Sequence, residues 1–542
     1  MNGNQILARA LQDQGVEDVF YLTAGPMVDA TNECGKLGMQ MVDVRHEQAA
    51  TFMANAYSRM RAKPSVCISG AGPSTTNFVT GIAHAFTDCA PVIALGGASP
   101  VTEYGLQAFQ EIDQVALMKP ISRWSERVYD VARIPELLDM AFAHAFSGTP
   151  GPVYLDFPSN VIYKEAPEGE IRWVKPKPRF RPQGDQVEID RAIDLLARAE
   201  RPLILTGSGI IWSQAAAELR RLVDAFGIPF MTTPQGRGVI PEDHPLSFIA
   251  ARGLAFKEAD VILMVGTRMN YVVSHVRPPR FNPDGKLIHI DVDATEVGRT
   301  RDVDVPIVAD ARQALRQLCE ANQGRIKPDR HSAWTGRLAA AHRERSRATE
   351  ELMNSDDTPI HPLRLCKEVR DWIDRDAVLV IDGQDTLTFA RQSIPYYEPH
   401  SLNSGPFGTM GVGLPFAIGA KVALPDKQVV VLHGDGSFGF NNMEMDSAAR
   451  QGIKVICVIC NNGGWTSKRP GKVKIGRDLG FSRYEKFAEV FDCYGERVED
   501  PAQIRPALER AAASGKPAVV NVIVNESAHG KSARFTDYGT YA

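Results

Sequence analysis

The sequence predicts an α/β protein of three doubly wound domains, each built on a parallel sheet. Short apolar runs alternate with helix-length segments, and glycines stand where many of the apolar runs end. The chain has 542 residues, enough for three or four domains of roughly 150 residues each. Segments with little strand pattern, at 164–188 and about 326–357, separate the domains that we expect at 1–165, 189–325 and 361–542.

The first block predicts several strands with helices between them. Apolar runs lie at 19–22, 41–44, 65–68, 91–95 and 152–156, and helical patterns cover 47–60 and 134–146. The segment that follows, 164–188, is rich in Pro, Lys and Glu, which is typical of a linker on the protein surface.

The second and third blocks repeat this pattern. The second predicts strands at 202–209, 261–266 and 287–291, and the charged segment after it predicts a connecting helix and linker. The third predicts strands at 377–382, 428–433, 455–460 and 518–524. Three units of comparable size therefore share one architecture.

Composition excludes several classes of partner. Lys and Arg number 61 against 65 Asp and Glu, a net charge of -4, so no overall charge attracts nucleic acid or an anionic membrane. No apolar run approaches the roughly 18 residues of a membrane span, and the first residues lack the layout of a signal peptide. We expect a cytoplasmic protein that binds neither nucleic acid nor membrane.

Cysteine usage indicates reduced, structural thiols. Eight cysteines in this length are too few for a disulfide framework. The one CxxC, Cys457 to Cys460, lies in an apolar run that predicts a buried strand, where the two side chains point to opposite faces. This placement favours structural cysteines over a redox or metal-binding pair.

The most specific motif is Gly434-Asp-Gly-Ser437, which follows one predicted strand. Asn462 follows the next predicted strand, 27 residues after Asp435. A glycine-rich turn lets backbone N–H groups approach a diphosphate, and carboxylate and amide oxygens are hard ligands for Mg²⁺. Two ordinary turns, with Asp435 capping a helix, are the alternative. The combination favours a metal–diphosphate site at the carboxyl edge of a parallel sheet.

These motifs resemble those of the thiamine diphosphate (ThDP) enzymes of the acetolactate synthase-like superfamily, and the resemblance covers the whole chain. It implies that Asp435, Asn462 and the carbonyl of Gly464 bind Mg²⁺, while Gly436 and Ser437 contact the diphosphate. It also implies a pyrimidine-binding domain at 1–165, a central nucleotide-binding-like domain at 189–325 and a pyrophosphate-binding domain at 361–542.

The resemblance identifies Glu47 as the glutamate that hydrogen-bonds the cofactor pyrimidine, because Arg45-His-Glu-Gln-Ala-Ala50 matches the family's His-Glu-x-x-Ala pattern. The chemistry requires an acid at this position, since protonating the aminopyrimidine allows the thiazolium carbon to lose its proton. The alternative is a glutamate in the first turn of a helix, where the helix dipole favours negative charge.

Further cofactor contacts follow from the same resemblance. Gly25 and Gly72 would lie on the pyrimidine side. Met410, among glycines, would wedge the cofactor into its bent shape, although methionine is also an ordinary gap filler in cores. Gln384 would belong to the second diphosphate loop, where Asp385 replaces an asparagine common in relatives.

The second block indicates which branch of the family the chain resembles. Gly266-Thr-Arg268-Met-Asn270-Tyr271 resembles a segment of the acyl-CoA branch, and it lacks the Phe-Asp-Asp that usually follows this arginine in flavin-containing synthases. We therefore expect no FAD. Arg268 and Asp291 are candidates for binding ADP or the nucleotide of CoA. Asp291 would approach the ribose from a strand end, or would instead cap a helix.

Two departures bear on catalysis. Gln110 stands where oxalyl-CoA decarboxylases tend to have glutamate. Its neutral amide suits carbon–carbon lysis. The alternative is an ordinary polar contact at a helix start. Glu496 stands where relatives of the acyl-CoA branch show tyrosine, and is a candidate for altered substrate choice or an extra proton donor.

Two further segments carry open alternatives. The loop after Asn462 is rich in Lys and Arg, so it is either a solvated surface loop or an anion-binding patch beside the active-site rim. The C-terminal segment from Ser527 is either a tail or a lid over bound acyl-CoA.

The sequence therefore predicts a ThDP- and Mg²⁺-dependent 2-hydroxyacyl-CoA lyase that yields formyl-CoA and an aldehyde or ketone. Oxalyl-CoA decarboxylase and an acetolactate synthase-like carboligase are the alternatives within the family, and a catalytically silent nucleotide-binding paralogue is the alternative outside catalysis. The resemblance implies a homodimer or homotetramer whose active sites are shared between subunits.

Overall fold

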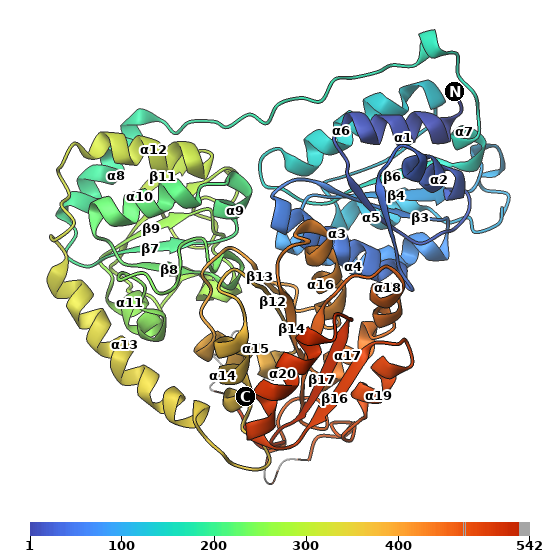
Figure 1. Cartoon of the computed structure of the whole chain (residues 1–542). Helices are drawn as coiled ribbons and strands as arrows, with labels where there is room; N and C mark the ends of the chain where they lie inside the picture. The colour runs from blue at the N-terminus through green and yellow to red at the C-terminus, as the bar shows by residue number, and fades with distance from the viewer. Residues whose placement is uncertain (470, 472, 531–542) are drawn as a thin grey trace.

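A computed structural model describes residues 1–469, 471 and 473–530, and it contains three parallel α/β domains around three separate sheets (Figure 1). The N-terminal and C-terminal sheets have six strands each and the central sheet has five. The C-terminal segment that is expected to be a tail or a lid falls mainly on 531–542, which lies outside the described residues. No helix in the described part of the chain is long and apolar enough to cross a membrane.

The N-terminal sheet has the strand order β2-β1-β3-β4-β6-β5. Helices α1, α2 and α6 pack on one face, while α3 and α4 pack on the other. The strands are β1 (Asp18–Tyr21), β2 (Gln40–Asp43), β3 (Ser65–Ser69), β4 (Val92–Ala98), β5 (Trp124–Arg127) and β6 (Val153–Pro158). The helices are α1 (Gly3–Asp13), α2 (Val28–Lys36), α3 (Glu47–Arg61), α4 (Pro73–Asp88), α5 (Gln114–Met118), α6 (Ile134–Phe146) and α7 (Ser159–Ile162).

The central sheet has the order β11-β10-β9-β7-β8, and a long extended linker connects it to the first domain across the top of Figure 1. Its strands are β7 (Pro202–Thr206), β8 (Phe230–Thr232), β9 (Val261–Val265), β10 (Lys286–Asp291) and β11 (Val305–Val308). Its helices are α8 (Gln186–Arg198), α9 (Gly209–Ser213), α10 (Ala216–Phe226), α11 (Arg252–Glu258) and α12 (Ala311–Asn322). The connecting helix α13 (Ser332–Met353) then runs to the third domain, as the charged segment predicts.

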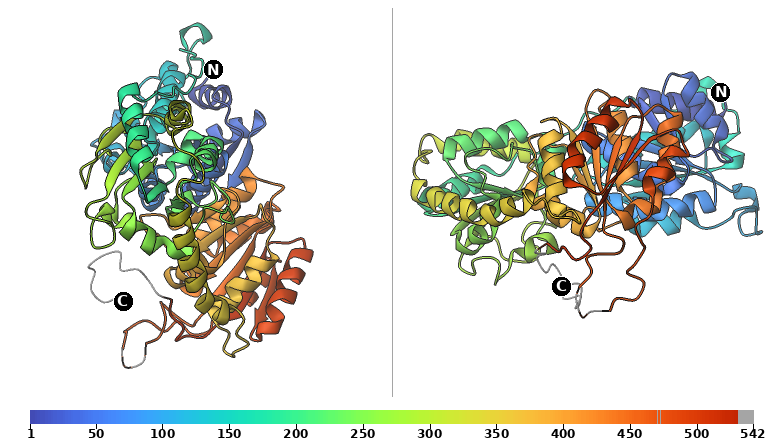
Figure 2. Two further views of the ribbon diagram at one scale, coloured as in Figure 1. Left: turned by 90° about the vertical axis from the view of Figure 1, so that its left-hand side faces the viewer. Right: turned by 60° about the horizontal axis from the view of Figure 1, so that its bottom comes forward.

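The C-terminal sheet, β13-β12-β14-β15-β17-β16, repeats the strand order of the first sheet. From the side, the orange and red elements of this domain lie below the other two domains (Figure 2). Its strands are β12 (Val378–Asp382), β13 (Ser401–Asn403), β14 (Val429–Gly434), β15 (Ile456–Asn461), β16 (Tyr494–Val498) and β17 (Ala518–Ile523). Its helices are α14 (Pro362–Trp372), α15 (Gln384–Ser393), α16 (Gly413–Ala423), α17 (Asp435–Asn441), α18 (Glu444–Arg450), α19 (Tyr484–Glu489) and α20 (Ile504–Ala513).

Every strand predicted from the sequence is present to within a few residues, and the predicted helices at 47–60 and 134–146 are α3 and α6. The pattern does not predict β5, β8, β11, β13 or β16. Each of these five is an edge strand, with a neighbour on one side only. The prediction of structural cysteines is confirmed, because Cys457 and Cys460 are free thiols buried in the cores on opposite faces of the sheet.

One apolar core joins the first and third domains. Helix α3 packs directly on α16, and both helices occupy the same position in their repeated topologies. Phe52 of α3 meets Phe416 of α16 edge to face, with ring centroids 6.0 Å apart. At Gly419 the helices are so close that a Cβ atom would lie 2.2 Å from the carbonyl oxygen of Met53. Only glycine fits this contact.

We predict that Gly419→Ala destabilises the protein by about 1–3 kcal/mol or more, because the added methyl group must push α16 away from α3. Chemical unfolding monitored by circular dichroism measures this change. Gly336→Ala is the matched control, since Gly336 lies within α13 with open space around its Cα. The control should gain up to about 1 kcal/mol from helix propensity alone. Equal effects of the two changes would contradict the packing argument.

Candidate active site

The predicted metal–diphosphate motif lies at the carboxyl edge of the C-terminal sheet. Strands β14 and β15 are paired in parallel, with Gly434 opposite Cys460, so Asp435 and Asn462 leave the sheet at nearly the same level. Asp435 begins α17, where backbone N–H groups are free to bind an anion. The sheet thus brings together two motifs that are separated in the sequence.

Asp435 has the environment expected of a metal ligand. The residue is only 3% exposed, and its Oδ2 atom is buried with no hydrogen-bond partner among the described residues. Burial raises its pKa to about 6, because the charged carboxylate is poorly solvated there. A cation would supply the missing partner. Among the described residues, no group of three or more His, Cys, Asp or Glu side chains could hold a metal ion. The ligands expected here are one carboxylate, one side-chain amide and one backbone carbonyl, which do not form such a group.

The loop after β15 is shaped to present its oxygens. Asn462 Oδ1 accepts the Gly464 N–H at 3.2 Å, and its Nδ2 donates to the Thr466 carbonyl at 3.2 Å. Gly436 lies against the Trp465 ring, where a Cβ would be 2.5 Å from a ring atom. A cavity of about 90 Å³ opens here, lined by Gln384, Asp385, Met410, Gly434, Asp435, Gly436, Ser437, Asn462, Gly464 and Trp465, among others. These residues fit a magnesium diphosphate.

The basic loop after Asn462 both holds the local structure and reaches the large cavity described below, which Lys474 lines. Arg477 is buried and donates to the carbonyls of Asn462 (3.1 Å) and Thr466 (2.9 Å). Lys468 pairs with Glu526. Arg477 therefore holds the loop after β15 in shape, and it also forms an ion pair with Asp478 at 3.0 Å. Lys472 of the same loop lies outside the described residues.

Asp382 supports the same cavity and belongs to the segment with Gln384 that resembles the family's second diphosphate loop. It ends β12, is fully buried, and accepts the Gly413 N–H at 2.9 Å. Ser437 Oγ donates to its backbone carbonyl at 3.2 Å. Asp382 thus connects the turn that contains Ser437 to the segment after Met410. Met410 itself is 41% exposed and lines two cavities. The position of Met410 fits a cofactor contact better than a core gap filler.

Glu47 forms a second half-site in the first domain. It is 7% exposed, and its carboxylate accepts hydrogen bonds from Ser74 Oγ (2.5 Å) and Asn77 Nδ2 (2.8 Å). His46 caps the helix through Nδ1, which accepts the Gln48 N–H. The glutamate does not line the cavity that contains Asp435. The two half-sites of one chain are therefore separate.

Gln110 lies beside the Glu47 half-site. It has a left-handed conformation (φ 61°) and packs on Gly72, where a Cβ would approach the Gln110 Cβ to 2.7 Å. Both residues line a surface cavity of about 340 Å³. Gly25 is in the same region, because its carbonyl oxygen faces Gly70. Gln110 precedes Asp113, which is the N-cap residue of α5. Gln110 therefore does not make the contact at a helix start that was its alternative role.

A buried network behind Gly72 was not predicted. Gln114 Oε1 accepts the Gly72 N–H at 2.6 Å, and its Nε2 donates to Asp156 at 2.5 Å. Asp156 also accepts from Tyr154 (2.8 Å) and Arg127 (2.7 Å). The network fixes the turn that leads to Ser74 and hence the donor to Glu47. Its members are spread over more than 40 residues, so no local motif reveals it.

The C-terminal domain holds the helix that begins at Glu47. The carboxylate of Glu444, on α18, accepts the backbone N–H groups of Arg45 (3.1 Å) and His46 (3.2 Å). Ser447 donates to the same carboxylate at 2.7 Å. The residue is 1% exposed, and burial raises its pKa to about 7. Asn441 adds a second link, from Gln48 (3.3 Å) to the Gly411 carbonyl (2.7 Å).

A large cavity of about 650 Å³ lies between the three domains. Its lining includes the predicted Arg268 and Asp291 of the central domain and Gln384 and Met410 of the C-terminal domain. Arg268 donates to the Thr87 carbonyl of the first domain at 2.5 Å. Asp291 ends β10, and burial raises its pKa to about 6. A turn rather than a helix follows Asp291, so the helix-cap alternative is wrong.

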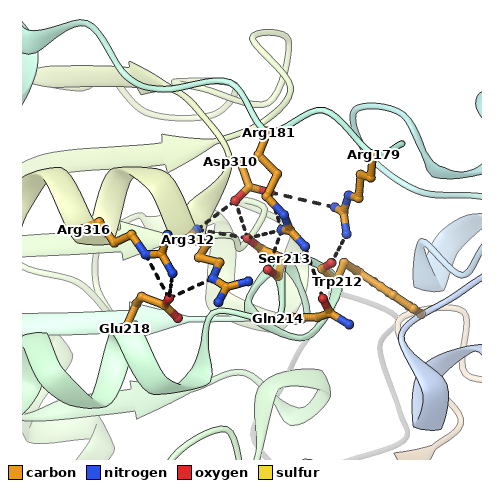
Figure 3. Close-up of polar contacts among 9 residues, drawn as sticks. All are labelled: Arg179, Arg181, Trp212, Ser213, Gln214, Glu218, Asp310, Arg312 and Arg316. Carbon is orange, nitrogen blue, oxygen red and sulfur yellow. Dashed lines mark hydrogen bonds and ion pairs between the residues drawn. The ribbon is translucent and has the colours of Figure 1, made fainter. Parts of the chain in front are cut away.

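The interdomain linker reaches this cavity at Arg179, and Figure 3 shows the polar contacts that hold the linker on the central domain. Arg179 donates to the Trp212 carbonyl and lies 4.2 Å from the Phe146 ring centroid. Arg181 binds the Ser213 carbonyl (2.5 Å) and Asp310 (3.1 Å). The extended linker is therefore fixed to the central domain by paired arginines.

Glu496 lies apart from both half-sites. It is on edge strand β16, paired with Arg510 at 2.5 Å and hydrogen-bonded to Tyr494. It lines none of the cavities described above. The structure therefore gives Glu496 a structural partner and no position from which to donate a proton to a ligand in these cavities.

Comparison with known proteins assigns all three domains. Residues 1–117 match the N-terminal TPP binding domain of thiamine pyrophosphate enzymes, residues 189–318 the central domain and residues 383–522 the C-terminal TPP binding domain. This chain belongs to the thiamine pyrophosphate enzyme family. Thiamine pyrophosphate is another name for ThDP, so the predicted family and cofactor class are confirmed.

Relatives of this ThDP enzyme have different reactions in their names. It is 35% identical to the acetolactate synthase large subunit IlvG of Mycobacterium tuberculosis, over 97% of this chain and 96% of the relative. It is 32% identical to a 2-hydroxyacyl-CoA lyase of Arabidopsis thaliana (98% and 97% covered). It is 31% identical to an oxalyl-CoA decarboxylase of Escherichia coli (99% and 97% covered).

We predict that Asp435→Ala weakens ThDP binding in the presence of Mg²⁺ by at least about 10-fold, because the cation loses an anionic ligand. Isothermal titration calorimetry measures the dissociation constant. Asp492→Ala is the control, since Asp492 is an exposed residue of the same domain that pairs with Lys516. Equal affinities of the two variants would show that the metal is bound elsewhere.

A second prediction concerns Glu444→Gln and pH. The folded pKa of Glu444 is raised from 4.5 to about 7, so its contribution to stability is present below pH 4.5 and lost as pH rises through 7. The stability of the wild type relative to the glutamine variant should therefore fall over this range, by about 3 kcal/mol at most. Urea unfolding at several pH values measures it. Glu489→Gln, at an exposed pair, should show no such trend.

Proposed function

We propose that this ThDP enzyme is a 2-hydroxyacyl-CoA lyase, which cleaves the C1–C2 bond of its substrate to formyl-CoA and an aldehyde or ketone. The observation that carries the proposal is the neutral amide of Gln110, which lies beside Gly72 in the Glu47 half-site. An amide can donate a hydrogen bond to a carbonyl or hydroxyl group without adding negative charge near a developing carbanion.

The roles of the chain's own groups follow from their positions. When bound, ThDP supplies the carbon nucleophile that attacks the thioester carbonyl. Asp435, Asn462 and the Gly464 carbonyl would hold Mg²⁺, with Gly436 and Ser437 at the diphosphate. Glu47, held by Ser74 and Asn77, would give and take the proton of the cofactor pyrimidine.

The large cavity supports an extended substrate. Its volume of about 650 Å³ lies within the range of cofactor and ligand sites. Arg268 and Asp291 would bind ADP or the nucleotide of CoA there. Met410 and Gln384 line both this cavity and the diphosphate cavity, so the two are adjacent.

A shared active site between two subunits is part of the proposal. Glu47 does not line the cavity that contains Asp435 in the same chain. A homodimer or homotetramer would place the Glu47 half-site of one subunit against the diphosphate half-site of another.

An acetolactate synthase-like carboligase is the second candidate. Its support is the 35% identity to IlvG, which is slightly higher than the identity to the lyases. Oxalyl-CoA decarboxylase is a third candidate, with 31% identity. Incubation of the holoenzyme with 2-hydroxyacyl-CoA, oxalyl-CoA and pyruvate in parallel, followed by product analysis, separates the three. Formyl-CoA from 2-hydroxyacyl-CoA supports the lyase; acetolactate from pyruvate would replace it.

We predict that Glu47→Gln lowers kcat by at least about 100-fold with little change in ThDP affinity, because an amide cannot exchange the required proton. Steady-state kinetics on the active substrate and calorimetry with ThDP measure the two effects. Glu126→Gln, a partly exposed glutamate of the same domain, is the control. Turnover of Glu47→Gln at the wild-type rate would contradict the assignment of Glu47.

The absence of a flavin remains a prediction, based on the segment from Arg268 to Asn270. The purified protein should show no flavin absorbance bands. Stoichiometric FAD in the spectrum would favour the synthase candidate.

A further inference from the structure

A second carboxylate, besides Asp435, faces the diphosphate cavity. Asp385 lies in the first turn of α15 and lines this cavity together with Asp435, Gly436 and Ser437. Its Oδ2 atom is buried and has no hydrogen-bond partner among the described residues. The roles assigned above to the magnesium ligands and the diphosphate contacts do not use this oxygen.

The fold places Asp385 beside the turn that would hold the diphosphate. Helix α15 begins after Gly383, where an added Cβ would lie 3.1 Å from the Gly434 nitrogen. Ser437 Oγ donates to the carbonyl of Asp382, the residue before that glycine. Because the cavity has a volume of only about 90 Å³, a diphosphate bound at Gly436 and Ser437 must also approach Asp385.

Charges of both signs surround Asp385. The loop after β15 provides three cations, strand β15 provides a thiol and α17 provides a carboxylate: Lys474, Arg469, Arg477, Cys460 and Asp435. Burial raises the pKa of Asp385 above its ordinary value, and the three cations oppose this rise. Its position in the first turn of α15 also favours the charged form, because the helix dipole is positive there.

A bound diphosphate reverses this preference. Two like charges in a cavity with little water repel each other strongly, and a carboxylate in that position takes up a proton. Protonation converts Oδ2 from an acceptor that repels a phosphate oxygen into an O–H donor. A hydrogen bond from this donor to an anionic oxygen is stronger than one between neutral groups.

We propose that Asp385 binds the cofactor diphosphate as the neutral acid, so that the protein takes up a proton at Oδ2 when ThDP binds. The proton comes from the solvent and returns to it when the cofactor leaves, and no covalent bond to the cofactor is made or broken. The proposal rests on the cofactor class and is independent of which of the three reactions the enzyme catalyses.

The test compares the wild type with Asp385→Asn. Asparagine has nearly the same shape as aspartic acid, and its Nδ2 donates at every pH, so this variant keeps the hydrogen bond without the proton. Asp492→Asn is the matched control, at an exposed residue of the same domain that pairs with Lys516. The full-length, cofactor-free proteins are titrated with ThDP at saturating Mg²⁺. Calorimetry in buffers of different ionisation enthalpy then gives the number of protons taken up.

We expect the wild type and the control to take up as much as about one proton more per ThDP than Asp385→Asn near neutral pH. Proton exchange by Asp435 and by the diphosphate itself is common to all three proteins and cancels in this difference. The affinity of the wild type relative to Asp385→Asn should therefore fall as pH rises, by about 10-fold per pH unit at most.

Asp385→Ala tests the hydrogen bond itself. This variant has no donor at the position, so it should bind ThDP about 10- to 100-fold more weakly than Asp385→Asn at every pH. Without cofactor, Asp385→Asn should melt no lower than the control, because an amide replaces a carboxylate that has a buried, unpartnered oxygen.

Equal proton uptake by the wild type and Asp385→Asn would overturn the proposal, since Asp385 would then stay ionised against the cations of the loop. Two Mg²⁺ ions per site in the wild type and one in Asp385→Asn would also overturn it, because Asp385 would be a metal ligand. A cofactor-free Asp385→Asn protein that melts well below the control would make the carboxylate structural, with the same consequence. None of these measurements uses turnover, so failure of the lyase assay would leave the result standing.

Discussion

The close contact between α3 and α16 is the constraint on which the rest of the structure depends. At Gly419 the backbone of the C-terminal domain lies directly against the backbone of Met53 in the N-terminal domain, inside a continuous apolar core. Because α3 begins at Glu47, the same contact sets where the catalytic candidate lies relative to α17 and α18. Glu444 and Asn441 can reach the start of α3 only because the two helices pack this closely.

The central domain is joined to the others by buried polar contacts and by Trp212, which packs edge to face on Phe146 of the first domain. Arg59 and Asp88 of the first domain form a buried pair at 3.6 Å, and Gln235 of the central domain contacts both residues. Arg237 and Glu242 make a similar connection to the backbone around Tyr396 in the C-terminal domain. Burying these charges costs desolvation energy that offsets much of their mutual attraction. These contacts leave room between the domains for the large cavity.

The cofactor motifs and the large cavity are built differently. Asp435, Asn462 and Glu47 sit in short motifs that can be recognised one by one. The residues around the large cavity come from all three domains and from the linker. A few changes there can alter the substrate while the cofactor motifs stay the same.

The sequence by itself determined the interior strands, the three-domain order and the two cofactor motifs, since each depends on residues close together in the chain. Among the edge strands, β2 alone follows an apolar run that the sequence predicts; β5 and β16 are only partly buried along most of their length, so they lack a continuous apolar run. Only the tertiary structure revealed Glu444, whose partner Arg45 is 399 residues away, and the Gln114–Asp156 network. It also decided that Glu496 pairs with Arg510 and that Arg477 donates to the Asn462 carbonyl in the loop after β15. These contacts depend on which side chains meet once the domains have packed, so the sequence around each residue does not predict them.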